Sequence, residues 1–494
     1  VITSAAPATD TPRAVRNSVV VFTGHILSRL IDLYAVILLA RTLGEAVLGQ
    51  FSFAVVYVSY FAILIDLGFN ITFVREMVRD KERQETLLTG MIIFKVALVA
   101  VGILLASTLI LLGDYPIDTL QLVWIMTFAL LISPKLPSLR VVYEQVFQAH
   151  LRMEVPTLIK LLDGGLLVAL IYSIIFYGQP VLWVMVAYVA CNLPGMIIIL
   201  LASRKYVRPG RTFDLRLMVG LLRQALPIAV LGVFATLYSR LDILFLSLWW
   251  DETAIGYYTA AYRLTEAFRI LPAAVLVSLY PVMVATADRI KEAFIPALSG
   301  GLKPLFILLI PVCIGTSFLT DRIIDLLYTS RYHPSGDALV ILVWAELFVT
   351  MATVLSHALI ALDRQRAVVK INGVMLLVNI LVNVQLIPRW SFVGAGVARL
   401  VTEGVGVIGF MFILRRLTQW TCWRPCLPLL PGAAVLTLWL YLFGDLSLPL
   451  MILSSVVVYG AALFVTRGVT RAELSDLRTA LMSTRLPAGT GIDV

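Results

Sequence analysis

Charged residues are scarce in this chain, and it lacks any polar stretch long enough to form a soluble domain. Of its 494 residues, 14% are charged and 60% are hydrophobic, whereas soluble domains carry about 25% charged residues. The loops between the apolar runs contain no nucleophile elbow, no glycine loop that could cradle a phosphate and no pair of catalytic carboxylates. We therefore expect a membrane protein that is not an enzyme.

Cysteine and histidine are also rare, with four residues of each. Cys191 and Cys313 fall in apolar runs, while Cys422 and Cys426 form the motif CWRPC on the side that we assign to the cytoplasm, where disulfides are rare. A zinc site needs closely paired ligands, and no second pair accompanies this motif. The sequence thus predicts neither a disulfide framework nor a metal centre.

Apolar runs of about 20 residues, the length that crosses a hydrocarbon core of about 30 Å, recur along the whole chain. Fourteen spans are expected, at 16–40, 47–66, 88–112, 119–139, 157–177, 181–202, 224–249, 256–284, 301–319, 338–361, 367–387, 392–414, 427–443 and 447–466. The predicted fold class is an all-α polytopic membrane protein with about 14 transmembrane helices.

Basic residues gather in alternate loops. One set of loops and tails holds 26 Lys and Arg residues and the other holds four, an asymmetry that places the basic side in the cytoplasm. We expect a multi-pass protein of the cytoplasmic (inner) membrane with both termini in the cytoplasm. The net charge of +9 is then a topology signal, and no nucleic-acid partner is expected.

The two ends of the chain are expected to be cytoplasmic tails. Residues 1–15 have no apolar core before Arg13, so they do not match a signal peptide. In the last segment, 467–494, Leu474, Leu477 and Leu481 share one helical face. This pattern fits a helix on the inner membrane surface as well as it fits a loosely ordered tail.

An internal repeat joins the two halves. EAVLGQFSFA begins at Glu45 and ETAIGYYTAA begins at Glu252, and each follows a span with an Arg/Asp couple, SRLID at 28–32 and SRLD at 239–242. Six spans separate the copies, so both have the same orientation, as in transporters built from parallel repeats with a site between them. The predicted domains are the tail 1–15, an N-lobe at 16–205, a C-lobe at 206–416, two extra helices at 417–466 and the tail 467–494.

Ionisable residues occur inside the predicted spans, where each costs roughly 2.5–3.5 kcal/mol. Three couples share a helix face, and each is either a structural ion pair or part of a site: Arg29 with Asp32, Lys160 with Asp163, and Arg399 with Glu403. Arg240 and Asp242 differ because they lie about 200° apart on a helix and cannot pair with each other. Each needs a partner on another helix, or water.

Six basic residues lie in the first, third, seventh, eighth and twelfth spans, and the eighth span holds two cations, Arg263 and Arg269, to one anion, Glu266. This grouping predicts an anionic ligand. Arginine suits planar, multidentate contact with phosphate, so a phosphate-bearing substrate would explain why Arg240 is kept in an apolar span. The candidate substrate-binding residues are Arg29, Lys95, Arg240, Arg263, Arg269 and Arg399.

Three blocks of the sequence resemble the oligosaccharide flippases, the Wzx-type polysaccharide transporters of the MOP superfamily. They are LLARTLGEAVLGQFSFAVVYVSYFAILIDLGF at 38–69, the stretch 225–272 with its Leu-Pro, Arg-x-Asp and Gly-Tyr-Tyr motifs, and VNILVNVQLIPRWSFVGAGVARLVTEGV at 378–405. The resemblance covers about residues 15–415.

The resemblance implies two six-helix lobes around a central cavity, plus two further helices, and transport by alternating access. The implied substrate is an isoprenyl-diphosphate-linked oligosaccharide that moves from the inner to the outer leaflet, with its diphosphate held by Arg29, Arg240, Arg263 and Arg399. No cofactor is implied beyond a coupling ion, Na+ or H+. The residues expected to couple ions or balance charge are Asp32, Asp66, Asp242, Glu266, Glu346 and Glu403. We expect a monomer among membrane lipids, with polysaccharide assembly proteins as a further class of partner.

Two other functions remain open at this point. A drug/cation antiporter of the same superfamily predicts an anionic cavity, which the arginines within the predicted spans oppose. A polysaccharide polymerase or membrane glycosyltransferase needs a large outer catalytic loop, and the longest outer segment is 320–337, with Arg331 and His333.

Overall fold

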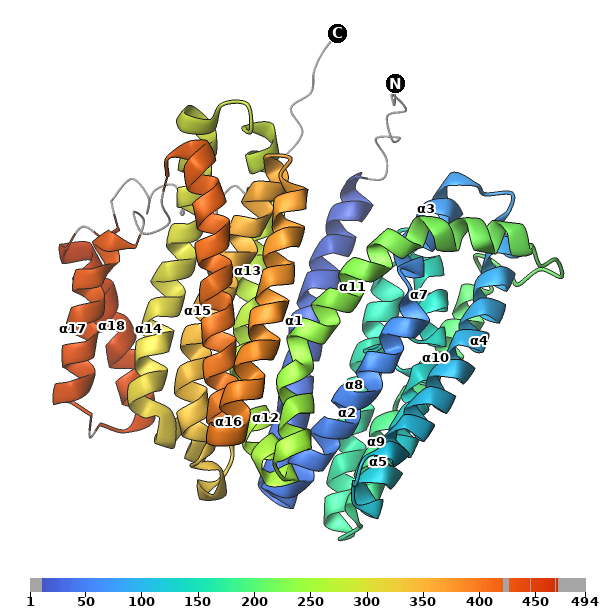
Figure 1. The fold of residues 1–494 in the computed structure, drawn as a ribbon, viewed down its shortest axis with the longest axis horizontal. Helices are drawn as coiled ribbons and strands as arrows, with labels where there is room; N and C mark the ends of the chain where they lie inside the picture. The colour runs from blue at the N-terminus through green and yellow to red at the C-terminus, as the bar shows by residue number, and fades with distance from the viewer. Residues whose placement is uncertain (1–10, 421–425, 445, 467, 470–494) are drawn as a thin grey trace. The chain divides into compact units, whose positions relative to one another are not determined.

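A computed structural model describes residues 11–420, 426–444, 446–466 and 468–469 (Figure 1). The first ten residues of the predicted N-terminal tail, Cys422 and the predicted surface helix around Leu477 lie outside the described residues. The side chains of residues 11–20, 22, 71, 227–236 and 239 are likewise not described.

The described chain is built from helices, without a strand in these ranges. The helices are α1 (Thr11–Leu43), α2 (Glu45–Asp66), α3 (Phe69–Arg79), α4 (Gln84–Leu109), η1 (Ile110–Leu112), α5 (Ile117–Thr127), α6 (Ala129–Ile132), α7 (Leu139–Ala149), α8 (Glu154–Phe176), α9 (Val181–Ala190), α10 (Asn192–Ser203), α11 (Leu215–Trp249), α12 (Glu252–Glu266), η2 (Ala267–Arg269), α13 (Ile270–Ala285), η3 (Ile290–Phe294), α14 (Ile295–Leu327), η4 (Ser330–Tyr332), α15 (Ser335–Ala361), α16 (Gln365–Thr418), η5 (Leu427–Leu429), α17 (Leu430–Leu442) and α18 (Leu448–Val465).

Each of the fourteen predicted spans coincides with one of these helices or with consecutive helical segments. Nine described helical stretches are long and apolar enough to cross a membrane. One of them, α16, holds two predicted spans, because its helical backbone is broken at Ser391, where φ is 50°. The prediction of an all-α polytopic membrane protein is therefore confirmed.

The helices differ from the prediction in two segments. The span predicted at 119–139 stops at Ile132 because Pro134 and Pro137 interrupt the helix, and the chain then forms the additional helix α7. Part of the segment predicted at 320–337 is helical, because α14 continues to Leu327.

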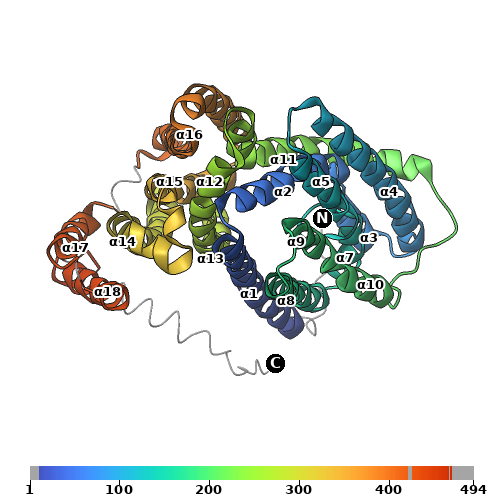
Figure 2. The ribbon, with the colours of Figure 1, turned by 90° about the horizontal axis from the view of Figure 1, so that it is seen from below.

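The chain divides into two units, which we describe separately. The first unit is Val1–Ala267, Leu327–Ala338 and Leu376–Ala398, and the second is Phe268–Leu326, Leu339–Met375 and Arg399–Val494. In the first unit, α1 packs against α8, and α2 packs against α4, α5, α11 and α12 (Figure 2). In the second unit, α17 packs against α18, and the thiol of Cys313 on α14 donates to the carbonyl of Val343 on α15 at 3.3 Å.

Two glycines allow α2 and α12 to touch backbone to backbone. A Cβ atom added to Gly49 would lie 1.7 Å from the carbonyl oxygen of Glu252, and one added to Gly256 would lie 2.0 Å from that of Glu45. These four residues are the equivalent positions of the two repeat copies. The contact is thus reciprocal, as a local two-fold relation between the copies requires.

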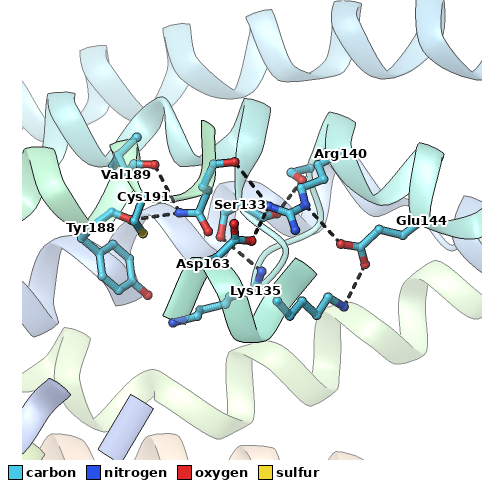
Figure 3. A network of polar contacts seen from close by, with 11 residues as sticks. Ser133, Lys135, Arg140, Glu144, Asp163, Tyr188, Val189 and Cys191 are labelled. Atoms are coloured by element: carbon cyan, nitrogen blue, oxygen red, sulfur yellow. Dashed lines mark hydrogen bonds and ion pairs between the residues drawn. The ribbon is translucent and has the colours of Figure 1, made fainter. Parts of the chain in front are cut away.

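A network of buried charges joins α7 to α8 (Figure 3). The Arg140 side chain is fully buried, and its guanidinium lies 2.7 Å from an Asp163 carboxylate oxygen and 3.2 Å from a Glu144 oxygen. The Lys160 ammonium lies 2.8 Å from the other Glu144 oxygen. Lys160 and Asp163 therefore each pair with a residue of α7, Glu144 and Arg140 respectively, and not with each other.

Replacing Gly49 or Gly256 with alanine is expected to destabilise the protein by about 1–3 kcal/mol, because the added methyl group overlaps a backbone carbonyl that cannot rotate away. Gly220 on α11, where an added Cβ meets nothing within 4 Å, supplies the control, since an alanine there favours a helix. Thermal unfolding of the purified variants in detergent measures the difference. Equal unfolding temperatures for Gly49→Ala and Gly220→Ala would contradict the close contact.

Arg140→Met is expected to cost about 3–5 kcal/mol, because it leaves Asp163 buried without its cation. The double variant Arg140→Met/Asp163→Leu should regain most of this loss. The exposed pair Arg152–Glu154, 3.2 Å apart, is the control, since Arg152→Ala should cost at most about 1 kcal/mol. The stability of both variants is measured by unfolding in detergent. If Arg140→Met is as stable as Arg152→Ala, the network is not structural.

Candidate functional site

A break between α6 and α7 projects Lys135 toward α1. The turn is closed by the Ser138 hydroxyl, which donates to the Ser133 carbonyl at 2.6 Å, and by the Lys135 amide, which donates to the Ser133 hydroxyl at 3.2 Å. The Lys135 ammonium forms an ion pair with Asp32 and lies 5.2 Å from the centre of the Tyr188 ring. The spacing of Arg29 and Asp32 on one helix allows an ion pair between them. In the structure, Asp32 pairs with Lys135 instead.

The carboxylate of Glu266 on α12 bridges two arginines. One oxygen lies 3.6 Å from the Arg240 guanidinium, and the other lies 3.4 Å from that of Arg263. Arg240 also lies over the Tyr262 ring, 5.7 Å from its centre. The prediction that Arg240 needs a partner on another helix is confirmed.

These two groups form one cluster, because Arg263 also interacts electrostatically with Asp32 and Tyr188. We call it the cationic cluster, and it consists of Lys135, Arg240, Arg263, Asp32 and Glu266. Its side chains are between 23% and 33% exposed, so a ligand can reach them. With three cations against two carboxylates, the cluster favours an anion.

Arg29 lies one helical turn before Asp32, and its side chain is exposed. Within the described residues it makes no hydrogen bond or ion pair, although it acts electrostatically on His25. Its position on α1 leaves another positive charge near Asp32.

Asp242 contacts polar side chains other than the partners of Arg240. It is 2% exposed, and its two oxygens accept from the Tyr258 hydroxyl at 2.6 Å and from the Asn383 amide nitrogen at 2.9 Å. The same amide nitrogen donates to the side-chain oxygen of Asn379 at 3.0 Å. The side-chain oxygen of Asn383 is buried and has no hydrogen-bond donor.

The remaining predicted residues lie elsewhere. Lys95 is fully buried, with its ammonium 3.8 Å from Asp66. In the second unit, Arg269 lies 3.3 Å from Glu346. Arg399 and Glu403 both act electrostatically on Glu346, so these four residues form a separate group. The role predicted for each of them stays a prediction.

Our reading of the sequence missed Lys135, Tyr188 and Tyr262. The signal for Lys135 was present, because a lysine between Pro134 and Pro137 marks a break inside an apolar span. No comparable signal identifies the two tyrosines, since tyrosine is common in membrane helices. Among the described residues, no group of three or more His, Cys, Asp or Glu side chains could hold a metal ion.

A family model matches the part of the chain that contains the cationic cluster. Residues 14–287 match the model of the family described as polysaccharide biosynthesis protein. Two curated relatives are from Haloferax volcanii: "Probable flippase AglR" is 30% identical over 175 residues, and "Probable low-salt glycan biosynthesis flippase Agl15" is 22% identical over 172 residues. Each match covers 35% of this chain, and it spans only 37% and 36% of the respective relative.

Solved structures share the fold. The lipid II flippase MurJ, in an inward closed conformation, matches with a TM-score of 0.75 at 15% identity, over 95% of this chain and 100% of that one. An inward-facing multidrug resistance MATE transporter of the MOP superfamily matches with a TM-score of 0.61 at 15% identity, over 79% of this chain and 95% of that one. With a family model that covers more than half of its length, the chain belongs to the polysaccharide biosynthesis protein family, whose MOP-superfamily flippases its sequence resembles.

Proposed function

We propose that this protein is a flippase that moves an isoprenyl-diphosphate-linked oligosaccharide from the inner to the outer leaflet by alternating access. The observation that carries the proposal is the accessible cationic cluster, which lies on largely apolar helices and on the turn between α6 and α7. Membership of the family and the names of its glycan-biosynthesis relatives support a glycan as cargo. The protein would work in the cytoplasmic membrane, with both termini in the cytoplasm and without making or breaking a bond.

Glu266 would act as an exchangeable counter-ion for the diphosphate. Its contacts with Arg240 and Arg263 are 3.6 and 3.4 Å long, longer than the 2.7–2.9 Å of a strong charge-assisted hydrogen bond. A diphosphate offers more acceptor oxygens and more charge than a single carboxylate. It would therefore displace Glu266 and contact both guanidiniums, while Glu266 would return when the substrate leaves.

A drug/cation antiporter is the alternative that the shared MATE fold keeps open, since fold alone does not determine the cargo. The two functions require binding sites of opposite charge. An organic cation would have to enter a cluster in which Lys135, Arg240 and Arg263 outnumber the carboxylates, and like charges repel. The cluster therefore favours the lipid diphosphate.

We further propose that transport is coupled to sodium at Asp242. Hard cations, of which Na+ is one, prefer oxygen ligands. The buried Asp242 carboxylate and the side-chain oxygens of Asn379 and Asn383 are ligands of this kind. Amide oxygens coordinate a metal cation but do not hold a proton at neutral pH, so this group favours Na+ over H+. The unpartnered oxygen of Asn383 supports the proposal.

Arg240→Ala and Arg263→Ala are each expected to slow transport about 10- to 100-fold, because each removes a charged hydrogen-bond donor worth about 1.5–3 kcal/mol to the diphosphate. The measurement is the initial rate at which a fluorescent isoprenyl-diphosphate oligosaccharide crosses the membrane of proteoliposomes. Arg389→Ala, at an exposed arginine outside the cluster, is the control and should transport normally.

Glu266→Gln tests the same mechanism in the opposite direction. Without the competing carboxylate, the Kd for the diphosphate should fall several-fold, since about 1 kcal/mol corresponds to roughly a fivefold change. Unchanged transport in both arginine variants, or transport of the cationic dye ethidium by the wild type, would overturn the proposed function.

Asp242→Asn is expected to abolish the stimulation of transport by an inward sodium gradient, because a neutral amide cannot balance the charge of a bound cation. The same proteoliposome assay measures this at equal pH on both sides, and a separate arm applies a pH gradient without sodium. Asp118→Asn, at an exposed carboxylate at the start of α5, should keep the stimulation. Stimulation by the pH gradient alone would identify H+ as the coupling ion instead.

A further inference from the structure

A pocket of about 380 Å³ lies in the first unit, where the segment between η1 and α5 meets the junction between α11 and α12. Its volume falls at the lower end of the range of about 300–1,000 Å³ found for small-molecule sites. None of its lining residues belongs to the cationic cluster. The topology predicted from the sequence places both of these segments on the outer side.

Aromatic rings form part of the lining. Tyr115 stacks on Phe53 with ring centres 4.9 Å apart, and its hydroxyl lies 3.2 Å from that of Ser247. Trp250 is 42% exposed, yet its indole N–H donates to the backbone carbonyl of Ile387 at 2.8 Å. The rings of Tyr115 and Trp250 are thus held in fixed orientations.

Acidic side chains provide the polar part of the lining. Asp114 is exposed, and Glu252 is partly buried, with one oxygen accepting from the Thr119 hydroxyl at 3.3 Å. No Lys or Arg is among the residues that line the pocket. A carboxylate accepts hydrogen bonds from neighbouring hydroxyls and repels a phosphate.

This combination fits a neutral sugar. The face of a sugar ring carries C–H groups that pack on aromatic rings through dispersion and weak C–H contacts, while its edge carries hydroxyls that donate to carboxylates. An aromatic belt at the membrane surface would leave the tryptophan N–H free for lipid headgroups or water. Here the N–H of Trp250 already donates to the protein backbone, so the carbon surface of the ring is what remains for a ligand in the pocket.

We infer that this pocket is a carbohydrate subsite that holds one neutral sugar residue of the transported glycan on the outer side. The ring would stack on Trp250 or Tyr115, and its hydroxyls would donate to Asp114 and Glu252. The inference rests on the proposed function for the source of the sugar, whereas the binding of a sugar to the pocket can be tested without transport. The cationic cluster and this pocket would then bind different parts of one substrate.

The probes are the methyl glycosides of glucose, galactose, mannose and N-acetylglucosamine, which carry neither lipid nor phosphate. Saturation-transfer difference NMR on the full chain in lipid nanodiscs detects their binding. At least one glycoside should receive saturation, and Trp250→Ala should reduce the signal at least fivefold. Trp249→Ala is the matched control, because Trp249 is 41% exposed and stacks on Phe245 outside the pocket.

A second pair of variants covers the case in which Trp250→Ala does not fold. Asp114→Asn should weaken the glycoside signal, whereas Asp118→Asn, at an exposed carboxylate outside the pocket, should not. Arg240→Ala should keep the glycoside signal while losing transport.

Absence of saturation for all four glycosides would overturn the subsite, as would equal losses in Trp249→Ala and Trp250→Ala. Displacement of the bound glycoside by tetramethylammonium would also overturn it, because the pocket would then be a cation site. Transport of the lipid-linked glycan without glycoside binding refutes the subsite alone. Glycoside binding without transport by the wild type refutes the flippase and leaves the subsite in place.

Discussion

The need to pair charged side chains within apolar helices constrains how these helices pack. Each such side chain loses several kcal/mol of hydration free energy unless a partner replaces the water. In the first unit, several of these partners come from other elements of the fold. Arg140 on α7 reaches Asp163 on α8, and Lys135 in the turn before α7 reaches Asp32 on α1. Each pair therefore fixes one segment against another, and the network in Figure 3 holds the turn that presents Lys135.

Charge pairing occurs both in the buried network and in the cationic cluster to which we assign the proposed function, and the two differ in exposure. Arg140 is fully buried and lies 2.7 Å from Asp163. An anion from solution therefore cannot replace Asp163 as its partner. Arg240 and Arg263 are about one quarter exposed, and both share Glu266 over longer distances. Weak, accessible contacts are the ones that a substrate anion can displace. The proposed function depends on this difference and not on the number of arginines.

The contact between α2 and α12 connects the repeat with both proposed binding regions. Gly49 and Gly256 bring the two backbones together, and Phe53 follows Gly49 by one helical turn, on the same face of α2. Glu252, whose carbonyl meets Gly49, also lines the proposed sugar pocket. Toward its other end, α12 carries Arg263 and Glu266, so a single helix contributes a carboxylate, Glu252, to the pocket and an arginine and a carboxylate to the cationic cluster.

By itself, the sequence determined the class of fold, because the length and apolarity of a transmembrane helix are local properties that no distant residue needs to supply. It also determined that Arg240 and Asp242 require separate partners, since helical geometry places them on different faces. Only the tertiary structure decided which partners these are: Glu266 for Arg240, Tyr258 and Asn383 for Asp242, and Lys135 rather than Arg29 for Asp32. Ion pairs form between groups that folding brings within a few ångströms of each other, and spacing along one helix cannot reveal a carboxylate or an ammonium that arrives from another.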